Sequence, residues 1–166
     1  MRTILETPER GIYVDGDSLI KTGPADSLER EAYILGLLVG VRGVPRVRSF
    51  STSLGGKRKT LMMDLMPGEP VDRLRDGMLA QIGSMVAMLY DAGVAHMRLR
   101  PEHVLYGNGV VSLVGFSKAS VLRCNPMARW GLSPDVTGEL SEEFKAEGPL
   151  SHPEGCIHTL LEALKG

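Results

Sequence analysis

Cysteine, aromatic residues, long apolar runs and an excess of charge are all scarce in this sequence, and each scarcity removes a class of protein. The two cysteines, Cys124 and Cys156, form no Cys-x-x-Cys pair. This argues against a disulfide framework or a structural zinc site and favours a reducing, cytoplasmic location. The longest apolar run, residues 32–41, is only about ten residues long and too short to span a bilayer. The N-terminal residues hold no apolar segment typical of a secretory signal.

Charge is balanced, with 19 basic and 20 acidic residues and a net charge of -1. Neither nucleic acid nor an acidic membrane surface is therefore expected as the main partner. Hydrophobic residues make up 43% of the chain and charged residues 23%, which is ordinary globular composition. A chain of 166 residues suits one domain or a small pair of lobes.

The N-terminal half predicts strands around one helix. Residues 11–21 alternate as a hairpin around Asp15-Gly16, and a helix follows Pro24. Strands are expected at residues 46–54 and 58–66, joined by a turn at residues 55–56, and the second is apolar enough to lie centrally in a sheet. The apolar face of the helix is expected to consist of Leu28, Ala32, Leu35 and Val39.

The C-terminal half has a different pattern, which begins at the linker MPGEP. We expect a helix at residues 76–92, a loop at 94–103, and two strands around Gly107-Asn108-Gly109. A loop-rich stretch with a short helix at 140–146 precedes a last helix that starts near Pro153. The order predicts an α+β protein with a small sheet-plus-helix N-lobe (1–66), a hinge (67–70) and a short, mainly helical C-lobe (71–166). A cleft between two lobes is a common ligand site.

Several segments, in this order, resemble protein-kinase motifs. HMRLRPEHVL (96–105) resembles the catalytic loop HRDLKPENIL, and LVGFSKA (113–119) resembles the metal-binding motif with DFG. Residues 19–21 resemble the strand with the phosphate-pairing lysine, EREAYIL its partner helix, and TLMMDLMPGEPVDRL the hinge strand. A weaker echo of the A-P-E segment lies at residues 133–136. The chain is thus similar, over residues 11–120, to the protein-kinase-like superfamily, in the compact form of RIO-type and lipopolysaccharide core kinases.

This resemblance implies a two-lobed, minimal protein-kinase-like fold with a nucleotide cleft. In the family, Lys21 would contact the ATP phosphates and Glu31 would hold Lys21, while Asp64 and Met66 would lie in the hinge that clasps adenine. A purely structural interpretation of Lys21 and Glu31 is equally open. They would then form a surface ion pair that ties helix to sheet and contributes only ~0–1 kcal/mol.

The same resemblance implies a degenerate catalytic centre. Arg98 stands where the family has its aspartate base, His103 replaces the metal-binding asparagine, and Gly115 replaces the DFG aspartate. An arginine cannot accept a proton, a glycine has no side chain, and imidazole suits softer metals than Mg²⁺. His96 corresponds to a structural loop residue. Because a glycine-rich loop is also missing, we expect no metal site and no ordinary kinase activity, while ATP binding stays open and Mg²⁺ doubtful.

Arg98, Arg100 and Lys118 would surround the place of the transferred phosphate. One hypothesis is a site for an anion or phospho-group, since arginine binds phosphate bidentately. The alternative is that Arg98 replaces the charge of the metal and pairs with an internal acid.

Three functions compete. The first is a pseudokinase, an interaction or regulatory module without phosphoryl transfer. The second is an atypical ATP-dependent phosphotransferase of the protein/lipopolysaccharide-kinase superfamily, and the third is a small α+β protein unrelated to kinases. A protein partner and a homodimer are expected because the last helix carries an apolar stripe at Ile157, Leu160, Leu161 and Leu164.

Overall fold

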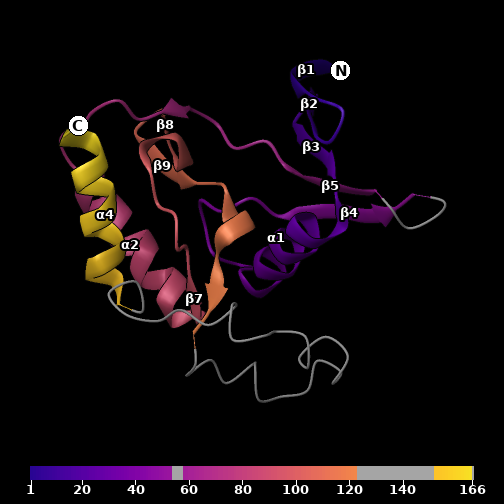
Figure 1. The fold of residues 1–166 in the computed structure, drawn as a ribbon. Helices are drawn as coiled ribbons and strands as arrows, with labels where there is room; N and C mark the ends of the chain where they lie inside the picture. Colours follow the sequence, from indigo (N-terminus) through magenta and orange to yellow (C-terminus); the bar gives the residue numbers. More distant parts are fainter. Residues whose placement is uncertain (54–57, 123–151, 166) are drawn as a thin grey trace.

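A computed structural model describes residues 1–53, 58–122 and 152–165 of the chain, and it has the α+β architecture expected from the sequence. Figure 1 shows an N-terminal sheet with one helix against it, and a second group of helices and short strands. The predicted turn at 55–56, Cys124, the echo at 133–136 and the predicted helix at 140–146 lie outside the described residues.

The N-terminal sheet has five strands, all antiparallel, in the order β1-β2-β3-β5-β4. The predicted hairpin is confirmed, with Asp15 opposite Ser18 across a two-residue turn. The predicted central position of the second apolar strand is also confirmed, since β5 lies between β3 and β4. The first strand was not predicted. The strands are β1 (Arg2–Glu6), β2 (Gly11–Asp15), β3 (Ser18–Gly23), β4 (Val47–Thr52) and β5 (Lys59–Asp64).

The helix α1 (Ala25–Leu37) packs against β3, β4 and β5. Its buried side includes Leu28, Ile34 and Leu35. The prediction that Val39 belongs to this face is wrong, because the helix ends before it and Val39 is 74% exposed. The buried face also carries a charged residue, Glu31, which is 1% exposed as a whole residue.

The C-terminal part combines two helices with short strands, so it holds more strand than the sequence suggested. The helices α2 (Met78–Asp91) and α4 (Pro153–Lys165) contact each other and run side by side in Figure 1. The predicted hairpin around residues 107–109 is confirmed. The short elements are β6 (Glu69–Pro70), β7 (Val94–Ala95), η1 (Pro101–His103), β8 (Val104–Gly107), β9 (Val110–Leu113), η2 (Phe116–Lys118) and β10 (Ser120–Val121).

Two segments that the sequence suggested were irregular contain regular structure. The hinge contains β6, which pairs with β8, and the expected loop at 94–103 contains β7 and η1. These strands are two residues long, and their pairing partners lie far along the chain. Local hydrophobic periodicity therefore carries no signal for them.

A single hydrophobic cluster links the sheet and the C-terminal elements. It includes Leu35 of α1, Leu61 of β5, Ile82 of α2, Phe116 of η2 and Leu160 of α4, each at most 1% exposed. The contact between α1 and η2 connects the N-terminal and C-terminal parts of this cluster. In the part of the chain that the structure describes, no helix combines the length and hydropathy needed to cross a membrane.

Candidate functional site

A cavity of about 450 Å³ lies between the N-terminal sheet and the segment 98–118. β2, β3, α1, the end of β5 and the η1 and η2 regions contribute its walls. Seven of the eight residues that the resemblance assigned to nucleotide-binding or catalytic-centre positions line this one cavity, although they are spread over most of the described chain. These residues are Lys21, Glu31, Asp64, Met66, Arg98, His103 and Gly115.

The ion pair between Lys21 of β3 and Glu31 of α1 lies on one wall of this cavity. Lys21 Nζ donates to both carboxylate oxygens of Glu31, at 2.7 and 2.9 Å. The Lys21 side chain is 19% exposed and that of Glu31 only 2%. The expectation of a surface pair is therefore wrong: this pair is largely buried, and removing one partner of such a pair typically costs ~3–5 kcal/mol.

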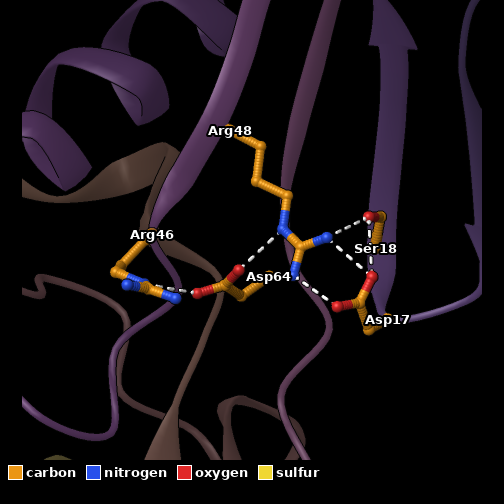
Figure 2. A network of polar contacts seen from close by, with 5 residues as sticks. All are labelled: Asp17, Ser18, Arg46, Arg48 and Asp64. Carbon is orange, nitrogen blue, oxygen red and sulfur yellow. Dashed lines mark hydrogen bonds and ion pairs between the residues drawn. The ribbon is translucent and has the colours of Figure 1, made fainter.

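Asp64, at the end of β5, is bound by two arginines, as Figure 2 shows. Arg46 Nε donates to one carboxylate oxygen at 2.9 Å, and Arg48 Nε donates to the other at 2.7 Å. These hydrogen bonds lower the pKa of Asp64 below its usual value. Because both of its oxygens accept hydrogen bonds from arginines, the Asp64 carboxylate stabilises this wall of the cavity.

Arg48 extends this network to the β2–β3 turn. It forms a bidentate pair with Asp17 at 2.6 and 2.8 Å, and it also donates to Ser18 Oγ at 2.8 Å (Figure 2). The Arg48 hydrogen bonds lower the pKa of Asp17 to about 2. The network ties three strands together at the end of the sheet where the hinge begins.

His96 lies beneath the cavity wall and is not among the residues that line it. Its ring is fully buried. The ring centroid lies 4.7 Å from the centroid of Phe116 and 5.5 Å from the centroid of His103. Its Nε2–H donates to the carbonyl of Val114 at 2.8 Å, whereas Nδ1 has no hydrogen-bond partner among the described residues. Burial lowers the pKa of His96 to about 4, so the ring is neutral at physiological pH.

His103 and Gly115 form an interlocked pair. His103 Nδ1–H donates to the carbonyl of Arg98 at 2.7 Å, which fixes the ring in the loop. A β-carbon built on Gly115 would lie 2.7 Å from His103 Nε2 and 2.9 Å from Cγ, closer than real β-carbons approach other atoms. Gly115 also has a φ of +81°, in the left-handed region that favours glycine. The imidazole therefore occupies the space that a side chain at position 115 would need.

Arg98 and Lys118 line the wall of the cavity that the segment 98–118 forms, whereas Arg100 is not part of the lining. Both lining side chains belong to exposed residues, and neither forms an ion pair within residues 1–53, 58–122 and 152–165. Arg98 therefore has no acidic partner among the described residues, and the interpretation that it pairs with an internal acid gains no support from them. The interpretation of Arg98 and Lys118 as anion ligands is compatible with their placement.

The residues around the cavity do not fit a magnesium ion. Mg²⁺ needs hard oxygen ligands, usually one or two carboxylates. The described lining offers only Glu31 and Asp64, and both oxygens of each already accept hydrogen bonds from Lys21 or from the arginines. Within the described residues, no group of three His, Cys, Asp or Glu side chains is placed to hold a metal.

Two features of this site were not predicted from the sequence. Arg10, just before β2, also lines the cavity, and the network around Arg48 supports its hinge side. Neither has a local sequence signal, because strand register brings Asp17, Arg48 and Asp64 together from distant positions.

Comparison with protein-family models and with curated proteins finds no match to this chain.

Proposed function

We propose that this chain is a catalytically degenerate protein of the protein-kinase-like superfamily, a pseudokinase that acts as an interaction or regulatory module. Two observations support the proposed two-lobed fold. A lysine on the third strand of an antiparallel sheet is paired with a glutamate on the helix that follows it. The cavity beside this pair is lined by the segments that resemble the hinge, the catalytic loop and the DFG motif.

The observation that carries the proposal is the contact between His103 and Gly115. Phosphoryl transfer requires a metal to neutralise charge on the phosphates and a base to orient the acceptor. The His103 ring fills the space of a side chain at position 115, so both metal-binding positions of the family are lost together. The guanidinium of Arg98 at the base position cannot accept a proton. A general base alone contributes about 10²–10⁴ in rate.

A cavity without this chemistry can still bind a ligand and transmit its presence. The walls come from α1 and the sheet on one side and from residues 98–118 on the other, so a bound ligand would contact both proposed lobes. A protein partner and a homodimer stay part of the proposal. The stripe on α4 no longer supports them, because Leu160 is buried and α4 packs on α2.

An atypical ATP-dependent phosphotransferase is the second candidate. The intact pair of Lys21 and Glu31 favours it, since this pair positions phosphates in active kinases. The two candidates differ in one measurable property, which is turnover of ATP.

The test is an ATP turnover assay with Mg²⁺ and with Mn²⁺, scored as ADP release and as phosphate transfer to the chain and to a mixed acceptor set. The variants are Lys21→Ala and, as a matched control, Lys59→Ala. Lys59 also pairs with a glutamate of α1, Glu29, but lies outside the cavity lining. We expect no turnover above background in wild type or either variant. Turnover in wild type and Lys59→Ala that is lost in Lys21→Ala would establish the phosphotransferase instead.

A further inference from the structure

We infer that the cavity binds an organic phosphate as the free anion, without a divalent cation, and that Arg98 and Lys118 hold the phosphate. This inference deepens the proposed function and rests on the same cavity. It differs from nucleotide binding of the kinase type in one respect: the positive charge that a metal would supply comes from the side chains of this chain.

The charges around the cavity are the first argument. Its described lining contains the cations Arg10, Lys21, Arg98 and Lys118 and the acids Glu31 and Asp64. Glu31 is neutralised by Lys21, and Asp64 belongs to a network with Arg46, Arg48 and Asp17 in which the formal charges cancel. Arg10, Arg98 and Lys118 have no ion-pair partner in the part of the chain that the structure describes. The lining therefore has an excess of positive charge.

The place of these cations is the second argument. Arg98 and Lys118 line the same wall of the cavity as His103 and Gly115, opposite Lys21 and the sheet. The hydrogen bond from His103 fixes the Arg98 backbone, so the guanidinium projects from a defined point. Arginine offers a fork of N–H donors that matches phosphate oxygens, and lysine adds a point charge.

The apolar wall is the third argument and sets the class of ligand. Ile12, Leu19, Met63, Leu105 and Val114 line the same cavity. A volume of about 450 Å³ falls in the range of small-molecule sites, which combine apolar walls with few polar groups. A ligand with both an apolar or ring portion and a phosphate fits this lining better than an inorganic anion does.

A metal ion would weaken this interaction. Mg²⁺ bound to a polyphosphate removes two negative charges from the ligand, and the lining offers no free carboxylate to coordinate the ion. We therefore expect affinity to be higher in a chelator than in excess Mg²⁺, the reverse of a metal-dependent nucleotide site.

The experiment is calorimetric titration of the full chain with ADP, pyrophosphate and adenosine, each in EDTA and in excess Mg²⁺. The variants are Arg98→Ala, Lys118→Ala and Arg98→Glu, with Arg100→Ala as a matched control outside the cavity lining. We expect ADP to bind in EDTA more tightly than pyrophosphate or adenosine. Each alanine variant of the lining should weaken ADP about tenfold, as for loss of a charge-assisted hydrogen bond. Arg98→Glu should abolish ADP binding, and Arg100→Ala should change it less than twofold.

Several results would overturn the inference. They are a requirement for Mg²⁺, an equal loss in Arg98→Ala and Arg100→Ala, or no binding of any probe in EDTA at millimolar concentration. Pyrophosphate binding as tight as ADP would overturn the assignment to an organic phosphate. The outcome is separable from that of the proposed function: ATP turnover contradicts the pseudokinase assignment whatever the EDTA titration gives, and failed titration without turnover contradicts only this inference.

Discussion

At the scale of single residues, the contact between His103 and Gly115 couples two positions that lie apart in the sequence. The imidazole is held by the Arg98 carbonyl and lies against the glycine, so a side chain at position 115 has no space. Introducing an aspartate at position 115 alone would therefore disturb the loop before it could create a metal ligand. The two positions must change together.

The energetic cost of filling this space can be isolated with two glycines of nearly equal φ. Gly115 has a φ of +81° and Gly109 a φ of +79°, but a β-carbon at Gly109 meets nothing within 4 Å. Gly109→Ala should cost about 1–2 kcal/mol of unfolding free energy, the backbone term alone. Gly115→Ala should cost a further ~1–3 kcal/mol from overpacking against His103. Chemical denaturation measures both.

A second background provides the control for this contact. In His103→Ala, the additional cost of Gly115→Ala over Gly109→Ala should largely disappear, because the atoms it meets are gone. Equal costs for the two glycine variants in the wild-type background would show that His103 moves aside freely and that the interlock is not rigid.

His96 makes the folding stability depend on pH. Its pKa is about 4 in the folded chain and near 6.5 when unfolded, so between these values the unfolded chain binds more protons. The stability from this group is fully present above pH 6.5 and is lost as pH falls towards 4, by about 3 kcal/mol in total. Urea denaturation at pH 7 and pH 4.5 should show most of this loss.

Two variants separate this effect from other titrations. His96→Gln keeps a donor near the Val114 carbonyl but does not titrate, so its loss of stability over the same interval should be smaller. His158→Gln, at an exposed position on α4, should behave as wild type. If His96→Gln and wild type lose the same free energy, the buried imidazole is not the source.

At the scale of elements, strand register creates the network that frames the hinge side of the cavity. Arg48 lies on β4, Asp64 ends β5 and Asp17 lies in the β2–β3 turn, and Figure 2 shows the three joined through one guanidinium. Each interaction depends on the pairing of strands that are distant in sequence. The network therefore reports whether the sheet has the strand order β2-β3-β5-β4 at this end.

NMR titration of the Asp17 carboxyl tests this arrangement. In wild type its pKa should be about 2, because of the Arg48 hydrogen bonds. In Arg48→Gln it should return towards 3.8, whereas Arg46→Gln should leave it near 2, since Arg46 pairs with Asp64 and makes no hydrogen bond to Asp17. An Asp17 pKa that Arg46→Gln raises as much as Arg48→Gln would contradict the register.

Elements with strong local patterns could be predicted from the sequence, and those formed by pairing alone could not. The periodic segments of α2 and α4 and the hairpins marked by Asp15-Gly16 and Gly107-Asn108-Gly109 are where the sequence suggested. β1 was missed because all five of its residues are exposed, so no face of it is distinguished by apolar residues.

At the scale of the whole molecule, the candidate site was largely predictable because its residues lie in short motifs with fixed spacing. Those motifs name Lys21, Glu31, Arg98, His103 and Gly115, and the fold brings them to one cavity. Burial and pairing could not be predicted, because they depend on the packing of α1 against the sheet and on strand register. The exposure of Glu31, the engagement of Asp64 and the unpaired state of Arg98 among the described residues appear only in three dimensions.

The continuous hydrophobic core connects the two walls of the cavity. One hydrophobic cluster joins the sheet, α1, α2 and α4, so the two walls of the cavity belong to one packed unit. A ligand held between Lys21 on the sheet and Arg98 on the opposite wall would add contacts between these walls. Binding should therefore stabilise the whole chain, and the melting temperature becomes a direct readout of occupancy.

The central claim is that this cavity binds an organic phosphate through its own cationic side chains, without a divalent metal ion. The most direct test compares the rise in melting temperature with ADP in EDTA and with ADP in excess Mg²⁺, for wild type. The account predicts a rise in EDTA that Mg²⁺ diminishes; at 100 times its Kd a ligand adds roughly 2.7 kcal/mol. A rise that requires Mg²⁺ would contradict the account and restore a metal-dependent nucleotide site.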